Sequence, residues 1–478
     1  MRVLLVNPPF YRLLGSHYNA NSLGIAYIAS YLNQHGHDCN LYNADYQSKS
    51  SFTKYSIIHR EKGFNSYKSY FEDVNHDIWE EVVENIIRYE PEWVGYTSYT
   101  ANISSIDIIS KKIKQRNPNI KQVIGGVHAT LDHNLLNKLK HIDFSVQREG
   151  EKAMLSLVSG THPSTISGVV CREGKKIINI GDADVNKHID ELPFPERDKF
   201  WNVNEEEKSI IDVSYICSIR GCPYRCNYCA SPFHWKRDKT QYRSPESVLC
   251  EMRHLKDNYW NDKQYDYTAS GNSQDKSELI IKDNTIVYFV DDIFTIKKPR
   301  VKQILNGMIE ENLNMPWKCE ARTDHLDEEI AQLMKDADCQ RVKLGFESGS
   351  DKILKDIQKD ETTDDMIKGA KLLKEAGVPF TAYFMTGFPN ETDEDLKKTI
   401  ELAEKIEADY YVLSILSPYF GTKMYYDMMD MGYELDKQPW EYFYHHSGEM
   451  LVNNQISDDM LKQYLSLNEL NNTSNNYI

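Results

Sequence analysis

CSIRGCPYRCNYCASP, residues 217–232, is the stretch around which the rest of the chain is arranged. It follows a β-rich run, residues 210–216, and places Cys222, Cys226 and Cys229 in the pattern Cys-x3-Cys-x2-Cys. Three thiolates this close together can bind three irons of a cubane 4Fe–4S cluster. An ordinary cluster has a fourth thiolate, so here the fourth iron would stay open to a reactive ligand. The spacing therefore predicts an iron–sulfur site as the chemical centre.

Structural zinc is the main alternative, because Cys217 would supply a fourth thiolate. Zinc sites usually bring their ligands as two separated pairs, whereas these cysteines form a single run. A third interpretation is that they are reduced thiols of the core. Three cysteines in eight residues beside Arg220 and Arg225 argue against it. The motif favours the cluster, with zinc as the second interpretation.

The composition indicates a folded protein of two or three domains. The chain has 478 residues, of which 40% are hydrophobic and 27% are charged, so it can form sizeable cores. Its 56 basic and 72 acidic side chains give a net charge of −16. This charge argues against nucleic acid as a partner, because neutralising phosphates requires a basic surface.

Cysteine usage and the N-terminus predict the compartment. The nine cysteines are odd in number and three of them lie in one motif, which is not the pattern of a secreted disulfide framework. A strand, residues 2–6, follows Met1 directly and leaves no room for a signal peptide. No apolar run approaches membrane-spanning length. We therefore expect a cytoplasmic protein with no membrane partner.

Strands and helices alternate through the first part of the chain. Strands are expected at 2–6, 39–44, 93–97, 121–124 and 143–146, and helices at 22–35, 76–89, 103–116 and 132–140. Residues 46–75 are polar, aromatic and aperiodic, which indicates an irregular excursion. The alternation predicts a doubly wound, flavodoxin-like parallel sheet over residues 1–164.

Sheets of this kind bind ligands at the carboxyl ends of their strands. Three of these ends carry glycines, hydroxyls or amides suited to a bulky ligand, namely Asn7 and Pro8, then Thr97, Ser98 and Thr100, then Gly125, Gly126 and His128. The glycine pair lets the backbone approach the ligand, and the hydroxyls can bond its amides or phosphate. Each group taken alone is as typical of an ordinary loop.

A second α/β domain is expected after a connection. Residues 165–205 contain a hairpin, with its turn at Glu173 and Gly174, and a proline-punctuated linker. Over residues 206–420, strands are expected at 212–217, 285–290, 316–321, 341–346, 379–385 and 410–415, and helices at 245–259, 299–312, 326–337, 363–376 and 393–407. Six such units predict a partial (β/α)6 TIM-like barrel, because a closed barrel needs eight. Residues 261–284 indicate a surface insertion, and residues 421–478 a C-terminal extension with a disordered tail.

Polar residues follow these apolar strands at the end where a βα barrel keeps its active site. After the cysteines they are Asp291 and Asp292, then Arg322, then Glu347, then Gly387 through Glu391. The carboxylates can accept hydrogen bonds from an ammonium or a ribose, and the guanidinium can pair with a carboxylate. Each taken alone would more often be a salt bridge or helix cap at the rim.

These motifs together resemble the cobalamin-dependent radical S-adenosylmethionine (SAM) enzymes. The resemblance rests on the cysteine motif with Tyr228, on the strings FVDDIF, CEARTD, GFESGS and GFPNET, and on GGVHAT and REGE in the first half. It runs from about residue 1 to about residue 430. It implies a cobalamin-binding domain followed by a radical SAM barrel.

The family likeness implies roles for the residues that match its motifs. SAM would be contacted by Tyr228, Asp291, Asp292, Arg322, Glu347, Gly387 and Glu391. Cobalamin would be contacted by Asn7, Pro8, Thr97, Ser98, Thr100, Gly125, Gly126 and His128. No catalytic residue is implied beyond the cluster ligands Cys222, Cys226 and Cys229.

The same likeness implies a radical reaction. A reduced 4Fe–4S cluster would cleave SAM to methionine and a 5′-deoxyadenosyl radical, and cobalamin would deliver a methyl group to an unactivated carbon. The alternatives are cyclisation, rearrangement or dehydration with the same cofactors and, less favoured, a zinc-stabilised cobalamin-binding regulatory protein. The implied partners are a small-molecule or natural-product-type substrate and an external one-electron reductant of the flavodoxin or ferredoxin type.

Two departures from the family pattern are visible. Asn390 replaces a glycine in GFPNET, although asparagine tolerates left-handed backbone. None of the 15 histidines lies in the Asp-x-His-x-x-Gly setting that ligates cobalt from below. His17 and His128 are therefore only weak candidates for a ligand to the metal.

Overall fold

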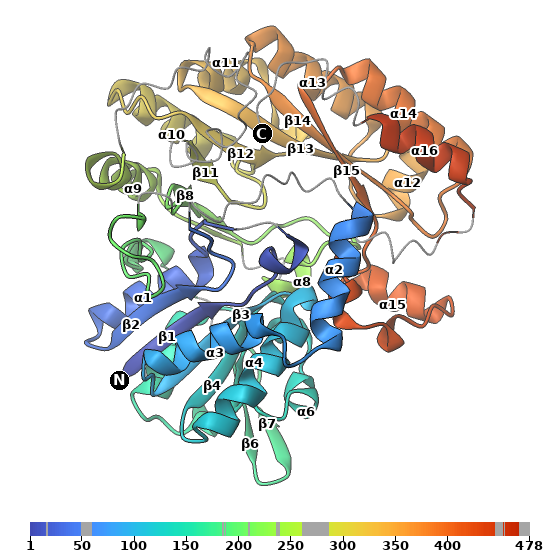
Figure 1. The fold of residues 1–478 in the computed structure, drawn as a ribbon. Coiled ribbons are helices and arrows are strands. Elements are labelled where there is room, and N and C mark those ends of the chain that lie inside the picture. The colour runs from blue at the N-terminus through green and yellow to red at the C-terminus, as the bar shows by residue number, and fades with distance from the viewer. Residues whose placement is uncertain are drawn as a thin grey trace. The chain divides into compact units, whose positions relative to one another are not determined.

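The computed structural model describes residues 1–15, 18–48, 60–183, 186, 188–208, 211–235, 240–260, 286–444, 453 and 455–467. The chain forms two compact units, which are treated separately below (Figure 1). The first comprises Met1–Val213, Tyr419–Gly421 and Glu434–Ser447, and the second comprises Ser214–Pro418, Thr422–Tyr433 and Gly448–Ile478. The C-terminal segment after residue 418 is therefore shared between the two units.

The first unit is built on a seven-stranded sheet in the order β2-β1-β3-β4-β5-β6-β7. Its strands are β1 (Arg2–Asn7), β2 (Asp38–Asn43), β3 (Trp93–Ser98), β4 (Lys121–Gly126), β5 (Phe144–Val146), β6 (Val169–Glu173) and β7 (Lys176–Asn179). The first five are parallel, and β6 and β7 add the predicted hairpin as an antiparallel edge. The parallel order 2-1-3-4-5 is that of doubly wound, flavodoxin-like sheets. It confirms the predicted fold class.

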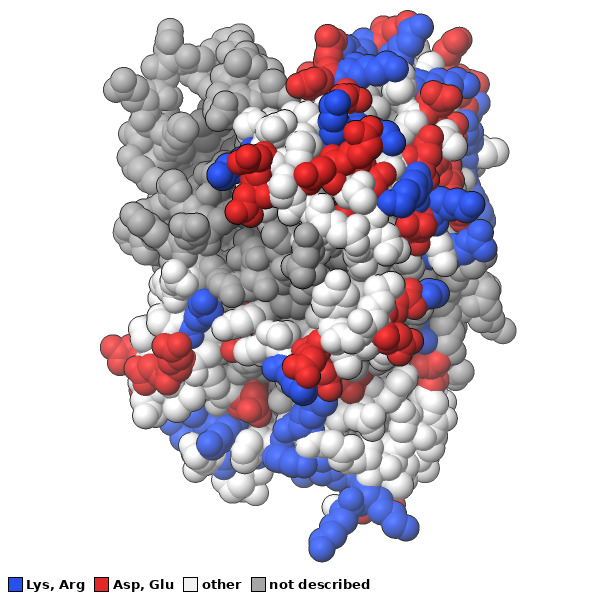
Figure 2. Space-filling model, turned by 90° about the vertical axis from the view of Figure 1, so that its right-hand side faces the viewer, with Lys and Arg blue, Asp and Glu red and all other residues white. Residues whose placement is uncertain are grey.

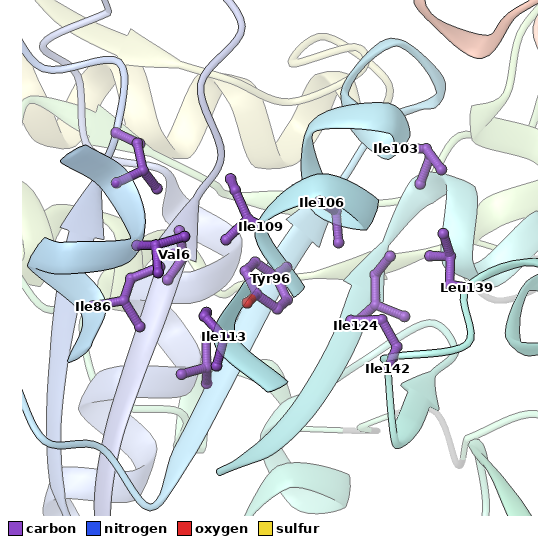
Figure 3. Packing of buried hydrophobic residues seen from close by; sticks show 14 of the residues in the cluster. Val6, Ile86, Tyr96, Ile103, Ile106, Ile109, Ile113, Ile124, Leu139 and Ile142 are labelled. Atoms are coloured by element: carbon purple, nitrogen blue, oxygen red, sulfur yellow. The ribbon is translucent and has the colours of Figure 1, made fainter. Parts of the chain in front are cut away.

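Helices connect these strands because their apolar residues recur on one face. They are α1 (Leu23–Gln34), α2 (Arg60–Glu72), α3 (Asp77–Arg88), α4 (Ile103–Arg116), α5 (Val127–Leu131), α6 (Leu135–Lys138) and α7 (Glu151–Val158). In α4 the residues Ile106, Ile109 and Ile113 are fully buried. They pack beside Tyr96 of β3, as Figure 3 shows. This cluster places the functional end of the sheet on a rigid base.

Residues 46–75 were expected to be irregular, and the described part of this segment corrects that expectation. Residues 60–72 form α2, whose Tyr67 is fully buried and donates its hydroxyl to the carbonyl of Ala101 at 2.8 Å. Phe71, one helical turn later, packs its ring 5.7 Å from that of Trp79. Two aromatic residues four apart are enough to anchor a helix whose other positions are polar.

Two further differences concern the helices of the first unit. The helix expected over 132–140 is only the short α6, because Asp132 to Asn134 form a turn in which the Asp132 carboxylate accepts from the amide of Asn134 at 3.0 Å, and α5 lies just before the predicted range. The turn at Asp132 competes with helix propagation. Helix α7, which begins at the last residue of the REGE motif, was not among the predicted helices.

The second unit holds six parallel strands in the order β15-β14-β13-β12-β11-β8. They are β8 (Tyr215–Ile216), β11 (Val287–Phe289), β12 (Trp317–Ala321), β13 (Cys339–Glu347), β14 (Phe380–Thr386) and β15 (Tyr410–Ile415). A small antiparallel pair, β9 (Ile219–Arg220) and β10 (Gln241–Tyr242), flanks the cysteine loop. The predicted partial barrel of six strands is confirmed.

Helices follow the strands of the second unit in the expected order. They are α8 (Ser231–His234), α9 (Pro245–Asn258), α10 (Lys298–Glu310), α11 (Glu328–Asp336), α12 (Asp351–Asp356), α13 (Thr363–Ala376), α14 (Asp393–Ile406), α15 (Lys423–Asp430) and α16 (Asp458–Ser466). Thr362 and Thr392 each form a capping box at the start of α13 and α14, and Gly377 ends α13 at φ 70°. Helix α12 was not predicted. The insertion over 261–284 and the disordered tail lie outside the described residues.

The surface in Figure 2 carries acidic and basic side chains side by side over much of its described area. Exposed pairs such as Lys397 with Glu401 on α14 contribute less than about 1 kcal/mol each to stability. Within the part of the chain that the structure describes, no helix combines the length and apolar character needed to cross a bilayer.

Candidate functional site

The cysteine motif lies in the loop after β8, and a buried carboxylate anchors the start of this loop. Asp291, which follows β11, accepts hydrogen bonds from the backbone amides of Ser218 at 2.6 Å and Ile219 at 2.8 Å, and from the Ser218 hydroxyl. Burial raises the pKa of Asp291 to about 6, while these donors act to lower it. Both oxygens are engaged inside the protein, so Asp291 holds the loop and is not the free acceptor for a ligand that the sequence suggested.

The three cysteines of the motif are unoxidised and near one another. Cys222 and Cys226 are buried and Cys229 is partly buried. Burial raises the pKa of all three thiols, that of Cys222 to about 11. The pKa of Cys229 is raised further by the Asp292 carboxylate and, to a smaller extent, by the other two cysteines. Thiols with raised pKa values bind metal only by releasing protons, so metal binding here is linked to pH.

The fourth thiol that a zinc site would use is engaged elsewhere. Cys217 donates its thiol to the carbonyl of Ile219 at 3.2 Å. A tetrahedral zinc site needs a fourth ligand, whereas a cubane cluster takes Cys222, Cys226 and Cys229 on three different irons. The contact made by Cys217 therefore favours the three-cysteine cluster.

The segment after α12 binds the other side of the cysteine loop. The amide of Asn227 donates to the carbonyl of Ile357 at 3.0 Å, and its side chain donates to the carbonyl of Asp356 at 2.9 Å. Arg225 pairs with Asp360 at 3.1 Å. Three contacts to residues 356–360 thus fix the central turn between Cys222 and Cys229.

Arg322 makes most of its hydrogen bonds within the protein. Its guanidinium forms a bidentate pair with Asp324, at 3.0 and 2.9 Å, and donates to the carbonyls of Lys359 at 2.9 Å and Asp360 at 3.1 Å. It also lies 3.8 Å from the ring centroid of Tyr224, inside the cysteine loop. Four of its five donors are therefore used within the protein. Arg322 supports the cluster loop, and its carboxylate partner is Asp324.

Glu347 and Tyr228 are brought together as the motifs imply. Glu347 ends β13 with a left-handed φ of 62°, a conformation that is costly for a residue with a side chain. Burial, and next the Glu347 carboxylate, raise the pKa of Tyr228 well above its usual value. Asp292, the other acid after β11, accepts a hydrogen bond from the hydroxyl of Ser231 just beyond the cysteines.

The GFPNET turn is organised by its own glutamate. The buried Glu391 carboxylate accepts from the amides of Gly387 at 2.7 Å and Phe388 at 3.2 Å, and from Thr386 Oγ1 at 3.0 Å. Burial raises the pKa of Glu391 to about 7. Gly387 has φ 95°, which favours glycine, whereas Asn390 is not among the residues with positive φ. The change from glycine at position 390 therefore introduces no left-handed strain.

Asn453 is a functional residue that sequence reasoning missed. Its side-chain amide is buried and donates to the carbonyls of Phe388 at 2.5 Å and Glu391 at 2.8 Å. Asn453 thus bonds to the GFPNET turn although the two are more than sixty residues apart in the sequence. Nothing in the sequence around Asn453 signals this contact, because the bond depends on how the C-terminal segment returns to α14.

In the first unit, the predicted strand ends meet at one edge of the sheet. Thr97 and Ser98 of β3 are in register with Gly125 and Gly126 of β4. Gly126 has φ 99°, and a Cβ there would lie 2.7 Å from the Ser98 amide, so only glycine fits. Ser98 is buried and donates to the carbonyl of Gly125 at 2.7 Å. The hydroxyl expected to meet a ligand is therefore used to join the two strands.

The remaining residues predicted to contact cobalamin differ in how exposed they are. Thr97, Gly125 and Gly126 are partly exposed at this edge, whereas Asn7, Pro8 and Thr100 are buried. Asn7 donates its side-chain amide to Asn43 Oδ1 at 3.0 Å, which ties the end of β1 to that of β2.

His128 is sealed inside the first unit. Its Nδ1 lies 3.0 Å from Thr100 Oγ1, and its ring packs against Phe420 and Trp440 of the C-terminal segment at centroid distances of 5.3 and 5.4 Å. Its side chain has no exposed surface. Burial lowers the pKa of His128 to about 4, so it stays neutral. This enclosure does not fit the expectation that His128 contacts a ligand. His17 lies outside the described residues.

Comparison with known proteins assigns both halves of the chain. The family model for the Radical SAM superfamily matches residues 216–403, and that for the B12 binding domain matches residues 15–158. An uncharacterized methyltransferase from Pyrococcus horikoshii is 27% identical over 434 residues, which cover 89% of this chain and 82% of that protein. An anaerobic magnesium-protoporphyrin IX monomethyl ester cyclase from Rubrivivax gelatinosus is 26% identical over 365 residues, covering 73% of this chain and 61% of that protein.

Solved structures share the fold of the whole chain. The radical S-adenosylmethionine methyltransferase TsrM from Kitasatospora setae, solved with cobalamin and a [4Fe–4S] cluster bound, superposes with a TM-score of 0.65. It is 16% identical, and the match covers 90% of this chain and 78% of TsrM. The cobalamin-dependent S-adenosylmethionine radical enzyme OxsB gives a TM-score of 0.60 at 14% identity, covering 99% of this chain and 56% of OxsB. At these identities the likeness establishes the fold.

The buried neutral His128 predicts a specific pH dependence of stability. Its pKa of about 4 in the folded protein lies below the ordinary value of 6.5, so the unfolded chain binds this proton more readily. Stability is therefore lost as the pH falls from 6.5 towards 4, by about 2 kcal/mol at about pH 5. His128→Gln removes this contribution. We expect the gap in free energy of unfolding between wild type and variant to narrow by that amount between about pH 7.5 and pH 5, measured by urea denaturation.

The exposed His162 supplies the matched control. His162→Gln leaves the pH dependence of the wild type unchanged, because His162 is accessible in both folded and unfolded chains. An unchanged gap for His128→Gln between the two pH values would contradict the burial of a neutral imidazole.

The clamp by Asn453 predicts a local change in dynamics. Asn453→Ala removes both hydrogen bonds to the GFPNET turn and leaves the carbonyls of Phe388 and Glu391 without that donor, at a cost of about 1–3 kcal/mol. We expect faster hydrogen exchange of the Gly387 and Phe388 amides, with the rest of the barrel unchanged, by mass spectrometry. Gln455→Ala, at an exposed position two residues on, is the control. Equal exchange in the two variants would show that the clamp is not needed.

Proposed function

The chain belongs to the radical SAM superfamily and joins its radical SAM domain to a B12-binding domain, and we propose that it methylates an unactivated carbon of a small molecule. The observation that carries the proposal is the loop of Cys222, Cys226 and Cys229, held in place at the carboxyl end of a six-stranded partial barrel. The B12-binding domain and the methyltransferase relatives favour methyl transfer as the outcome.

When bound, the cluster supplies the electron that cleaves the sulfonium of SAM, and cobalamin supplies the methyl group that is transferred. The chain's own residues bind and orient these groups. Tyr228, Asp292, Glu347 and the Gly387–Glu391 turn are the proposed SAM contacts, since they border the cysteine loop or the strand ends beside it. Asp291 and Arg322 act one step further back, by fixing that loop.

Cobalamin is proposed to lie at the edge formed by Thr97, Gly125 and Gly126. There the left-handed Gly126 lets the backbone approach a bulky group, and the partly exposed Thr97 offers a hydroxyl. No protein ligand to cobalt is proposed, because the imidazole of His128 is enclosed by Thr100, Phe420 and Trp440.

A second candidate function uses the same cofactors without methyl transfer. Three of the similar proteins are anaerobic magnesium-protoporphyrin IX monomethyl ester cyclases, from different organisms and at 22–26% identity. This favours radical cyclisation over rearrangement or dehydration as the alternative outcome. The proposed partners are an external one-electron reductant of the flavodoxin or ferredoxin type and a small-molecule substrate. A site that must be reduced suits the cytoplasm.

A labelling experiment separates the two outcomes. The anaerobic, reduced protein loaded with cobalamin is incubated with SAM carrying a deuterated methyl group and with extracts of small molecules. Methyl transfer predicts a product heavier than its substrate by a labelled methyl group in mass spectrometry. A product that lacks the label and is lighter by two hydrogens would support cyclisation instead.

The cluster assignment predicts the effect of removing one thiolate. The wild-type protein, purified without oxygen, is expected to be brown with about four irons per chain and to cleave SAM when reduced. Cys226→Ala should lose at least about 100-fold in cleavage while cobalamin still binds, because an incomplete donor set cannot hold the cluster. The control is Cys250→Ala, an exposed thiol on α9. Retained cleavage by Cys226→Ala would overturn the assignment.

A further inference from the structure

Lys359 is a buried lysine that none of the described motifs assigns. It lies between α12 and α13, and its side chain is 6% exposed. The residues on either side, Gln358 and Asp360, both have left-handed φ angles, of 56° and 53°. Two left-handed residues with side chains are costly, so surrounding contacts must hold this turn. The backbone is thus shaped to direct one ammonium inward.

Two buried carboxylates flank the ammonium of Lys359. Its Nζ lies 3.5 Å from Glu347 Oε1 and 3.6 Å from Glu361 Oε2. Burial acts to lower the pKa of Lys359, and the two carboxylates more than offset that effect, so its pKa is raised. The side chain therefore stays positively charged.

The lack of a side chain at Gly345 of β13 leaves room for the ion pair between Lys359 and Glu347. Gly345 lies on β13 two residues before Glu347, and a Cβ added there would lie 2.6 Å from Glu347 Oε1 and 3.2 Å from Lys359 Nζ. Arg322 donates to the carbonyl of Lys359 at 2.9 Å and holds the turn from the next strand. Contacts from the ends of two neighbouring strands, β12 and β13, thus fix Lys359.

The same turn is bonded to the cysteine loop. Asn227, next to Cys226, donates to the carbonyls of Ile357 and Asp356, and Arg225 pairs with Asp360. The turn that carries Lys359 thus contacts the residues on both sides of Cys226. A fixed positive charge therefore sits beside a predicted cluster ligand, inside a protein whose net charge is −16.

We propose that Lys359 is a positioning residue that raises the reduction potential of the cluster held by Cys222, Cys226 and Cys229, an inference that rests on the proposed function. One electron from the external reductant makes the cluster one unit more negative. A buried cation nearby stabilises the reduced form more than the oxidised form, because charges interact strongly away from water. Lys359 thereby favours one-electron reduction of the cluster, while the ion pairs with Glu347 and Glu361 hold the Lys359 side chain in position.

The test is a potentiometric titration of the cluster followed by electron paramagnetic resonance, on the full chain without SAM. Lys359→Met removes the charge and keeps the length of the side chain. We expect about four irons per chain and, at a fixed potential, an about tenfold lower ratio of reduced to oxidised cluster, equivalent to a midpoint about 59 mV more negative. Lys359→Arg should recover most of the wild-type midpoint.

Lys352→Met is the matched control. Lys352 lies on the neighbouring helix α12, where its half-exposed ammonium pairs with Asp395. Lys352→Met removes the same charge from the same part of the chain, and the midpoint potential of its cluster should equal that of the wild-type protein. A Lys359→Met protein with a full cluster and the wild-type midpoint overturns the proposal.

Glu361→Gln keeps the proposal testable if Lys359→Met does not retain a cluster. It removes a negative charge from the same network and should raise the ratio of reduced to oxidised cluster. An unchanged or lowered ratio in Glu361→Gln would then overturn the proposal. Failure of the proposed function can be distinguished from failure of the Lys359 proposal, because in the former case the wild-type protein itself would hold no iron or leave SAM intact.

Discussion

A loop without regular secondary structure must hold three thiols at fixed separations, and the rest of the second unit is built to meet this constraint. The loop cannot do so alone, because its own backbone bonds are few. Each of the next three strands contributes a contact: Asp291 after β11 accepts from Ser218 and Ile219, Arg322 after β12 contacts Tyr224, and residues 356–360 after β13 bind Arg225 and Asn227. The parallel sheet places these strand ends side by side, which is why a partial barrel suits this motif.

The alternation of strands and helices was readable because apolar periodicity is a local property. Strands β11 to β15 and the helices α9, α10, α11, α13 and α14 fall within a few residues of their predicted positions. The predicted secondary structure is wrong where tertiary contacts override the local composition. Helix α2 is polar on average but is anchored by Tyr67, and the turn at Asp132 delays the start of a helix that was expected to begin there.

The candidate site was predictable in its residue types and less so in their roles. Sequence places Asp291, Arg322 and Ser98 at strand ends, which is correct, but cannot say whether a polar side chain there faces a ligand or the protein. That choice depends on partners such as Ser218, Asp360 and Gly125, which come from other elements. Lys359 and Asn453 were missed for the same reason. Their contacts join segments whose proximity only the fold creates.

Neither unit is formed by one continuous piece of chain. The C-terminal segment contributes residues that support the candidate site in each unit. After Pro418 the chain gives Phe420 and Trp440 to the first unit, where they enclose His128, and then gives Asn453 to the second, where it clamps the GFPNET turn. Removing the C-terminal segment would therefore leave an imidazole exposed in one unit and two carbonyls without their donor in the other. Each such loss costs about 1–3 kcal/mol where the group stays buried. The segment that carries none of the family motifs is thus structural support for both.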